Sequence, residues 1–345
     1  MKKKLVIILI TSVLFFSMLY IIKRDIPQIK DPDVNIAFTI DNNYPLYNML
    51  VMDSILKNSK STFKFYIVEN NITLTNKLIM KLYMLLQPRA NLVFIKVPDN
   101  LISHYSNLFS LSGFRITSIG MSRIMLPDLL PKSVHKVLYL DSDILVTTDI
   151  KDLYDVDLRG KPAGMVTNIK PGEYKFHNFK NYFNSGVILM DLDLWRKNRI
   201  YEKMLSYVEN NKLLFMYDGQ FNPDAFRYPD QDLINLILEN EIYHLALFWN
   251  IQRQWFYEDV NDETRGIVHF VGKRKPWMNK SAKAPHELYN KYWYNSILVI
   301  FKPYHFYKNK CLYKKDIYRQ LRINIYLKLI ENFYMKLDMF FNKKD

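Results

Sequence analysis

The chain has 345 residues, enough for one large or two ordinary domains, and its 49% hydrophobic and 15% aromatic content excludes a globally disordered protein. Its single cysteine, Cys311, excludes an internal disulfide framework and a multi-cysteine zinc site. The formal net charge of +14 is compatible with nucleic acid, a membrane surface or an anionic substrate, but no RNA-binding signature accompanies it, so no nucleic-acid partner is expected.

Residues 1–24 are predicted to anchor the chain in a membrane. After three lysines, the stretch from Leu5 to Ile22 carries no charge, and a spanning helix needs roughly 20 apolar residues. A cleaved signal peptide is the alternative, but bulky residues stand where a cleavage site needs small ones. The lysines favour a cytoplasmic N-terminus, although basic residues also flank the other end of the stretch.

The chain from residue 25 to residue 290 is predicted to form a short stem and one α/β domain. Two prolines and polar residues in 25–33 indicate the stem, and no Gly/Ser linker divides 34–290. Strands alternate with helices, which favours a layered α/β domain with a mostly parallel sheet. Strands are predicted at 34–41, 63–69, 91–97, 137–140, 163–166, 186–190 and 267–270, and helices at 47–56, 74–86, from 193, and at 231–239.

Residues 291–345 are predicted to be a basic helical tail. From residue 301 onward there are 11 Lys or Arg residues against 4 Asp or Glu. Apolar residues at four-residue spacing (Ile317, Leu321, Ile325 and Leu329) predict a helix, which could lie on an anionic bilayer. A helix packed on the main domain is the alternative.

Two carboxylates one residue apart, Asp141 and Asp143, follow the buried strand 137–140. In an extended segment they would lie on one side, about 6.5–7 Å apart along the backbone. Two carboxylates this close repel each other unless a cation lies between them. Mg²⁺ and Mn²⁺ both accept carboxylate oxygens as ligands. Asp41 also ends a strand, and open α/β sheets bind ligands at the carboxyl ends of strands. The pattern is compatible with a metal-bridged diphosphate, but a lone D-x-D is a weak signal, and two solvated turn aspartates are the alternative that the pair by itself leaves open.

The segment "VLYLDSDILV" resembles the D-x-D segment of nucleotide-sugar glycosyltransferases with the GT-A fold. Five further motifs over roughly residues 35–277 resemble glycosyltransferase family 8, which contains bacterial lipooligosaccharide galactosyl- and glucosyltransferases and the glycogenins. The resemblance implies a Rossmann-like single domain and a UDP-sugar donor. It also implies transfer to a hydroxyl of a glycan, glycolipid or glycoprotein, with retention of anomeric configuration.

The nucleotide is expected at the first strand and at the D-x-D segment. "NIAFTIDNNY" resembles the loop that holds uracil and ribose, which implies Asp41, Asn43 and Tyr44. "SIGMSRIMLPDLLP" resembles the helix whose arginine reaches the diphosphate, and a guanidinium suits phosphate oxygens. The residues implied to bind the diphosphate are Arg123 on this helix and Asp141, Ser142 and Asp143 in the D-x-D segment.

The donor sugar is expected to lie against two further motifs. "YFNSGVILMDL" resembles a strand whose Asn184 and Ser185 face the sugar, while Gly186 permits close backbone approach or is a plain bulge glycine. "YPDQDLIN" resembles the motif whose first carboxylate, Asp230, orients the sugar and whose amide, Gln231, lies beneath the anomeric carbon. Helix capping is the alternative role of these acidic residues.

The closing motif "HFVGKRKPW" implies the remaining ligands. His269 would be the third metal ligand beside Asp141 and Asp143, and an imidazole suits Mn²⁺ better than Mg²⁺. Gly272 and Lys275 would meet the β-phosphate, where an ammonium neutralises charge on the departing UDP.

The catalytic residues implied by the resemblance are Arg123, Asp230, Gln231 and Lys275. Because an amide is a weak nucleophile, same-face attack is favoured over a covalent intermediate. One departure from the family is Asn168, where several members have Asp beside the sugar. A catalytically inactive membrane-anchored scaffold is the alternative function. A supply of UDP-sugars places the catalytic domain on the cytoplasmic face in a bacterium, or in the Golgi or endoplasmic reticulum lumen in a eukaryote.

Overall fold

The computed structural model describes residues 29–99, 101, 118–168, 177–211, 228–252, 260–272, 275–277 and 287–298. The predicted membrane anchor at 1–24 and the tail beyond residue 298 lie outside this part of the chain. Among the helices that the structure describes, none is long and apolar enough to cross a membrane.

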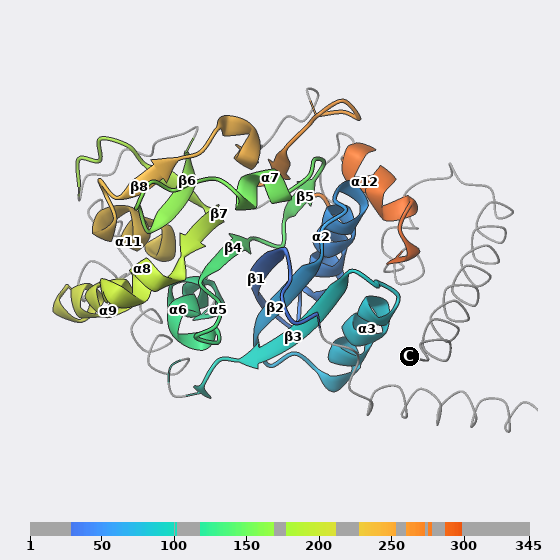
Figure 1. Ribbon diagram of the computed structural model, residues 1–345, viewed down its shortest axis with the longest axis horizontal. Coiled ribbons are helices and arrows are strands. Elements are labelled where there is room, and N and C mark those ends of the chain that lie inside the picture. Colours follow the sequence, from blue (N-terminus) through green and yellow to red (C-terminus); the bar gives the residue numbers. More distant parts are fainter. Residues whose placement is uncertain are drawn as a thin grey trace, which may run out of the picture.

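A seven-stranded sheet in the order β3-β2-β1-β4-β7-β6-β8 forms the centre of the domain (Figure 1). The first four of these strands run parallel, β8 runs parallel to β6, and β7 is antiparallel to both of its neighbours. The predicted α/β fold with a mostly parallel sheet is therefore confirmed. The strands are β1 (Val34–Asp41), β2 (Phe63–Asn70), β3 (Ala90–Lys96), β4 (Lys136–Leu140), β6 (Ala163–Thr167), β7 (Phe183–Asp191) and β8 (Ile242–His244).

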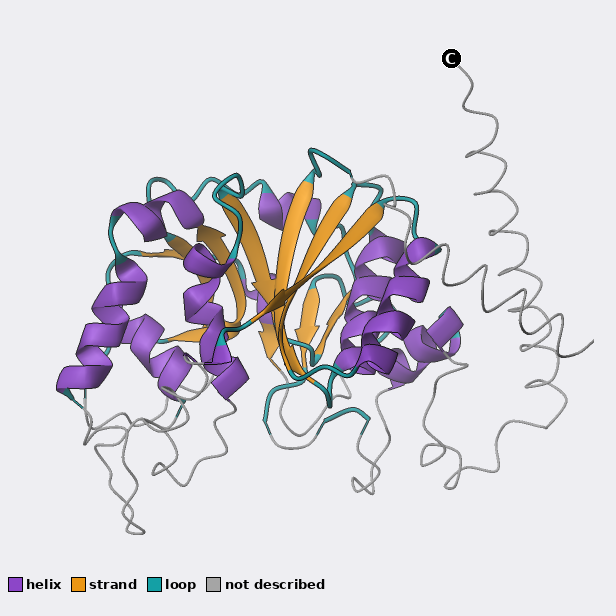
Figure 2. Ribbon diagram, turned by 90° about the horizontal axis from the view of Figure 1, so that it is seen from below, coloured by secondary structure: helices purple, strands orange, loops and turns teal. Residues whose placement is uncertain are grey.

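Helices lie on both sides of this sheet (Figure 2). The longer ones are α2 (Pro45–Asn58), α3 (Leu74–Leu85), α8 (Leu192–Lys197), α9 (Ile200–Asn210), α11 (Pro229–Ile237) and α12 (Glu287–Tyr294). The short ones are α5 (Ser118–Met121), η1 (Ser122–Met125), α6 (Leu126–Leu129), α7 (Lys151–Tyr154) and η2 (Leu247–Asn250). Each predicted helix of the main domain has its counterpart here, and the predicted domain boundary at residue 290 falls inside α12.

Alternation along the strands divides the core into two clusters, one on each face of the sheet. In β4, Leu138 and Leu140 belong to the cluster that includes α2, α3 and α12. Val137 and Tyr139 belong to the cluster that includes α8, α9, α11 and the segment after residue 118. Successive side chains of a strand point to opposite faces. Asp141 continues the second series, so it leaves β4 on the same side as Tyr139.

A second, three-stranded sheet connects distant parts of the chain. β10 (Ile267–His269) pairs antiparallel with β5 (Ile144–Val146) and parallel with β9 (Ile251–Gln252). His269 is thereby opposite Ile144, and the Phe270 amide donates to the Asp143 carbonyl at 2.9 Å. The sequence analysis did not predict β5 or β9, yet this sheet places the closing motif beside the paired carboxylates.

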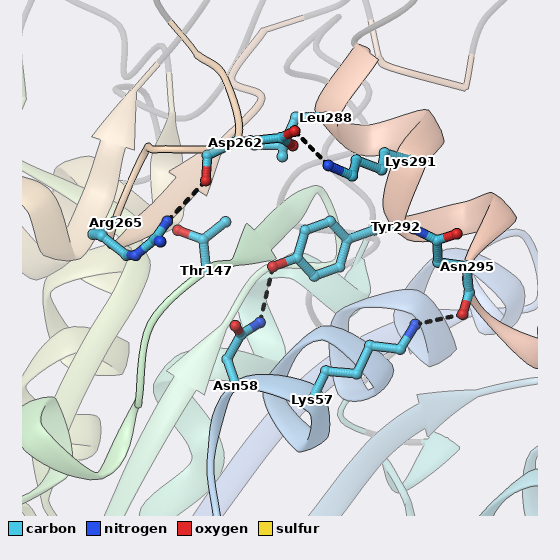
Figure 3. A pocket seen from close by; sticks show the side chains of 9 residues that line it. All are labelled: Lys57, Asn58, Thr147, Asp262, Arg265, Leu288, Lys291, Tyr292 and Asn295. Carbon is cyan, nitrogen blue, oxygen red and sulfur yellow. Dashed lines mark hydrogen bonds and ion pairs between the residues drawn. The ribbon is translucent and has the colours of Figure 1, made fainter.

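A hollow of about 370 Å³ marks the junction of α12 with α2 (Figure 3). Asn58 at the end of α2 donates to the Tyr292 hydroxyl at 2.9 Å, and Lys57 donates to the Asn295 carbonyl at 3.0 Å. Lys291 pairs with Asp262 across the rim (Figure 3). These contacts fix α12 against the main domain.

Replacing Asn58 with Leu is expected to lower the free energy of unfolding by about 1–3 kcal/mol. Its side-chain amide nitrogen lies 2.9–3.0 Å from Ser54 O, Val146 O and the Tyr292 hydroxyl, and the variant removes these three hydrogen bonds. Urea unfolding measures the change. Asn211→Leu is the matched control, because the Asn211 amide group donates only to Tyr207 O within its own helix end among the bonds described. Equal midpoints for the two variants would contradict the expectation.

Candidate active site

Asp141, Asp143 and His269 converge where the two sheets meet. Nε2 of His269 lies 3.7 Å from Asp141 Oδ2 and 3.3 Å from Asp143 Oδ1. One ligand atom from each residue lies within 4.8 Å of the other two, so one ion could contact all three after small side-chain adjustments. Two carboxylates and an imidazole are ligands that Mn²⁺ and related divalent ions accept. These residues therefore fit the predicted metal.

The segment between the two aspartates differs from the expectation of an extended strand. Residues 141–143 form a turn, because the chain leaves β4 of the large sheet and enters β5 of the small one. The carboxylates still share a site, since His269 contacts both of them. The second sheet, rather than strand alternation, brings them together.

The position of His269 depends on Gly186 in β7. A Cβ atom at residue 186 would lie 2.2 Å from His269 Cε1 and 2.9 Å from Asp141 Oδ2. The ring is buried, and its Nδ1 lies 2.9 Å from the Asn250 side-chain oxygen. Nε2 is therefore the ring nitrogen that faces the carboxylates. Gly186 lies where the register between β6 and β7 shifts, between the pairs Met165–Ile188 and Val166–Asn184, and its missing side chain leaves room for the imidazole.

Lys275 extends over the same cluster from the closing motif. Its ammonium pairs with Asp143 Oδ2 and donates to Phe270 O at 3.1 Å. Burial acts to raise the pKa of Asp143, but the nearby Lys275 and His269 outweigh it and hold that pKa below its usual value. Burial acts to lower the pKa of Lys275, and Asp143 outweighs it and raises that pKa. Both groups therefore stay charged at neutral pH.

Arg123, in η1, is enclosed by carboxylates. Its Nη2 lies 3.2 Å from Asp141 Oδ1 and its Nε lies 3.0 Å from Asp230 Oδ2. Nη1 donates to the carbonyl and the hydroxyl oxygen of Ser185 at 2.9 and 3.0 Å, and the guanidinium lies 4.7 Å from the centroid of the Tyr139 ring. Burial acts to lower the pKa of Arg123, but Asp141 and Asp230 outweigh it and raise it. The group predicted to reach a diphosphate is thus a fixed cation at the site.

The residues predicted to face the sugar gather at the amino end of β7 and the start of α11. The Gln231 side-chain oxygen accepts from the Ser185 amide at 2.9 Å and from Asn184 Nδ2 at 3.2 Å. Its nitrogen donates to the Tyr182 hydroxyl at 3.0 Å. Because β7 is antiparallel to β4, its amino end lies at the edge where β1 and β4 end. Asn184, Ser185, Asp230 and Gln231 thereby lie at the same edge of the sheet as the cluster of Asp141, Asp143 and His269.

The predicted nucleotide loop lies at the same edge, directly after β1. The backbone N–H of Asn43 donates to Asp41 Oδ1 at 2.8 Å. The Tyr44 ring meets the Trp277 ring edge-on, with centroids 6.3 Å apart, and Trp277 in turn stacks on Tyr47 at 3.9 Å. Burial raises the pKa of Tyr44, and the charges of Lys275, Asp143, Asp41 and Asp141 act on it as well. The loop and the closing motif therefore share one site.

The remaining predicted positions also have defined surroundings. Ser142 Oγ accepts from Asn48 Nδ2 at 3.3 Å. Gly272 has φ +90°, and none of the described residues lies within 4 Å of the position that a Cβ would take there. The Asn168 backbone amide donates to Tyr182 O at 2.7 Å, next to the residues that are predicted to face the sugar.

Three residues of the site were missed by the sequence analysis. Tyr139 donates to Asp141 Oδ1 at 2.6 Å, and its position two residues earlier in a strand could have indicated this. Tyr182 and Asn250 bind Gln231 and His269, respectively. Nothing local in the sequence marks Asn250, because the second sheet makes that contact.

This fold and this site define a glycosyltransferase. Residues 35–281 match the family model described as glycosyl transferase family 8, and the chain belongs to that family. It is 28% identical to general stress protein A of Bacillus subtilis, over 74% of this chain and 91% of that protein. It is also 28% identical to lipopolysaccharide 1,2-glucosyltransferase of Escherichia coli K12, over 71% of this chain and 72% of that protein.

A solved structure of the galactosyltransferase LgtC, in complex with donor and acceptor sugar analogs, has the same fold. The TM-score is 0.60 at 22% identity, covering 75% of this chain and 95% of that chain. The resemblance to family 8 and the GT-A fold, both predicted from the motifs, is confirmed.

Proposed function

We propose that the protein moves a sugar from a UDP-sugar to a hydroxyl of a glycan, glycolipid or glycoprotein, with retention and with Mn²⁺ bound. The observation that carries the proposal is the cluster of Asp141, Asp143 and His269 with two fixed cations, Lys275 and Arg123, beside it. Such a charge arrangement suits a diphosphate leaving group better than a neutral substrate.

Asp141, Asp143 and His269 would hold the metal, and Mg²⁺ is a second possibility. The imidazole nitrogen favours Mn²⁺, because Mg²⁺ prefers oxygen ligands. When bound, such an ion supplies charge stabilisation to the departing diphosphate. Lys275 adds a second positive charge at the same carboxylate, and Arg123 adds a third on the side of Asp230.

The hydrogen bonds of Gln231 support same-face attack. Its side-chain oxygen accepts from Ser185 N and Asn184 Nδ2, so its lone pairs are engaged. An amide oxygen in that state is a weak nucleophile toward an anomeric carbon. The acceptor's proton then goes to a phosphate oxygen of the donor, and the residues around Gln231 orient the sugar. A trapped sugar adduct on Gln231 would overturn this mechanism.

The proposed acceptor is supported by the name of a relative, and the proposed membrane attachment by the predicted anchor and tail. The E. coli relative is named as a lipopolysaccharide glucosyltransferase, which supports a glycolipid acceptor and a hexose donor. The predicted anchor at 1–24 and the basic tail at 291–345 support attachment to a membrane, beside a stem at 25–33 and a catalytic domain at 34–290. A membrane-attached enzyme would be well placed for a lipid-linked acceptor.

The experiment that tests the proposal measures UDP release by the full-length chain, purified in mild detergent. UDP-glucose, UDP-galactose, UDP-xylose, UDP-glucuronate and UDP-N-acetylhexosamines are offered with Mn²⁺, with Mg²⁺ and with chelator. Release from one donor, lost with chelator, supports the proposal and identifies the sugar. Binding of UDP without release from any donor indicates an acceptor requirement, which addition of lipopolysaccharide cores then tests. Absence of UDP binding favours the inactive scaffold.

Replacing Arg123 with Lys is expected to lower kcat/KM for this UDP release about 100-fold, the magnitude of losing one charge-stabilising donor. A single ammonium cannot contact Asp141, Asp230 and Ser185 together, as the guanidinium does. Arg196→Lys is the matched control, because Arg196 bonds Pro127 O and Val134 O away from the site. Equal losses in both variants would point to stability rather than to the site.

A further inference from the structure

A continuous chain of side-chain hydrogen bonds begins at His269 and crosses the site. His269 Nδ1 lies 2.9 Å from Asn250 Oδ1, and Asn250 Nδ2 donates to Asn184 Oδ1 at 2.9 Å. Asn184 Nδ2 donates to Gln231 Oε1 at 3.2 Å, and Gln231 Nε2 donates to the Tyr182 hydroxyl at 3.0 Å. The chain joins the predicted metal ligand to the predicted sugar-facing amides.

Backbone groups fix the direction of this chain. The Gly186 amide donates to Asn184 Oδ1 at 3.0 Å, and the Ser185 amide donates to Gln231 Oε1 at 2.9 Å. An N–H can only donate, so both side-chain oxygens are identified without ambiguity. Asn184 must then accept from the Asn250 nitrogen, which turns the Asn250 oxygen toward His269.

At the other end of this series of hydrogen bonds, the donors point in the same direction along the series. The Tyr182 hydroxyl donates to Asp232 Oδ1, so it accepts from Gln231. Asp232 Oδ2 accepts from the Tyr228 amide at 2.9 Å, and the carboxylate is fully buried. Each member from Asp232 to His269 is therefore oriented by its neighbour.

We propose that Asn250 is the positioning residue that holds His269 as the Nδ1–H tautomer and couples the metal site to the sugar site. An amide oxygen only accepts, so the ring nitrogen facing it carries the proton and Nε2 keeps its lone pair for a metal. Asn250 is 1% exposed, so water does not substitute for it. The inference rests on the proposed function, because it gives His269 the role of metal ligand.

Two substitutions separate the two contacts of Asn250. Asn250→Leu removes both the acceptor for His269 and the donor for Asn184. Asn250→Asp keeps an acceptor for the His269 Nδ1–H. It also places a carboxylate oxygen against Asn184 Oδ1, which removes the hydrogen bond between residues 250 and 184. Asn58→Leu is the control, since Asn58 bonds Ser54 O, Val146 O and the Tyr292 hydroxyl but none of the residues from His269 to Asp232 in the hydrogen-bond series.

Titration of the full-length chain with Mn²⁺, followed by electron paramagnetic resonance of the free ion, measures the effect. Asn250→Leu is expected to raise the Kd for Mn²⁺ by about 10–100-fold, the usual cost of losing such a partner. Asn250→Asp is expected to bind Mn²⁺ at least as tightly as the wild type but to lower kcat for UDP release. Wild-type affinity in the Leu variant, or equal weakening in both variants, would overturn the inference.

The tautomer can be read directly from long-range ¹H–¹⁵N spectra of histidine-labelled, metal-free protein, with His269 assigned by His269→Gln. Because Nε2 faces the carboxylates of Asp141 and Asp143, it can carry a proton in the metal-free protein, so the proton on Nδ1 is the readout. The wild type is expected to carry a proton on Nδ1, and Asn250→Leu is expected to lose it. A wild type without a proton on Nδ1 overturns the inference even when all variants fold poorly. This measurement needs no metal, so failure of the wild type to bind Mn²⁺ counts against the proposed function alone.

Discussion

Asp143→Asn is expected to abolish Mn²⁺ binding and to lower kcat/KM for UDP release by about 10³-fold, or ~4 kcal/mol of transition-state stabilisation. Asp143 offers one oxygen to the cluster and the other to Lys275. The isosteric amide keeps the volume of the side chain but carries no charge. The metal loses a ligand, and Lys275 loses the partner that keeps it charged and in place.

Isothermal titration with Mn²⁺ and a UDP-release assay measure these two losses. Asp193→Asn is the control, because Asp193 is exposed and its carboxylate pairs with His135 and Arg196, away from the cluster. Near-ultraviolet circular dichroism checks that the variant is folded. Metal-dependent release at the wild-type rate in Asp143→Asn would remove the cluster from the mechanism.

Gly186→Ala is expected to have a comparable effect although it adds only one methyl group. That carbon would lie 2.2 Å from His269 Cε1 and 2.8 Å from its Nδ1, distances that no real Cβ contact shows. The His269 ring is buried and bonded to Asn250, so it has to leave its present position, and the Asp141 carboxylate, 2.9 Å from the added carbon, has to shift as well. We expect at least about 100-fold weaker Mn²⁺ binding and about 1–3 kcal/mol lower stability.

Gly164→Ala is the matched control for this variant. Gly164 pairs with Leu189 of the same strand β7, and its added Cβ would meet Leu158 Cδ2 at 2.7 Å, the end of a side chain that can move. It should lose stability without losing affinity for Mn²⁺. If Gly186→Ala binds Mn²⁺ as tightly as Gly164→Ala does, the close approach of His269 is not needed for the metal site.

Local sequence signals were sufficient for six of the seven strands of the large sheet, whereas β8 was not predicted and most of the candidate residues came from the resemblance to family 8. The apolar run before Asp141 and the prolines and turns between elements act over a few residues, so the chain alone reveals them. The direction of β7 has no such signal, because it depends on which neighbours the strand pairs with. Without that direction, Asn184 and Ser185 could not be placed at the edge where β1 ends.

The partners of the candidate residues were harder to predict than the residues. Asn250 contacts His269 only because β9 and β10 pair, and Arg123 contacts Asp230 only because η1 lies beside α11. Both contacts are made by side chains whose types are common on protein surfaces. Tertiary pairing, rather than composition or spacing, turns them into parts of a site.

Because β5 pairs with β10, the residues of the site come together late in the synthesis of the chain. The two aspartates leave the ribosome long before His269 and Lys275, and β10 has no partner in the small sheet other than β5 and β9 among the strands described. Contacts between distant segments form slowly, because the loop between them must first close. A nascent or truncated chain that ends before β10 therefore carries the carboxylates without the imidazole, and the cluster of Asp141, Asp143 and His269 is complete only when nearly the whole domain has been synthesised.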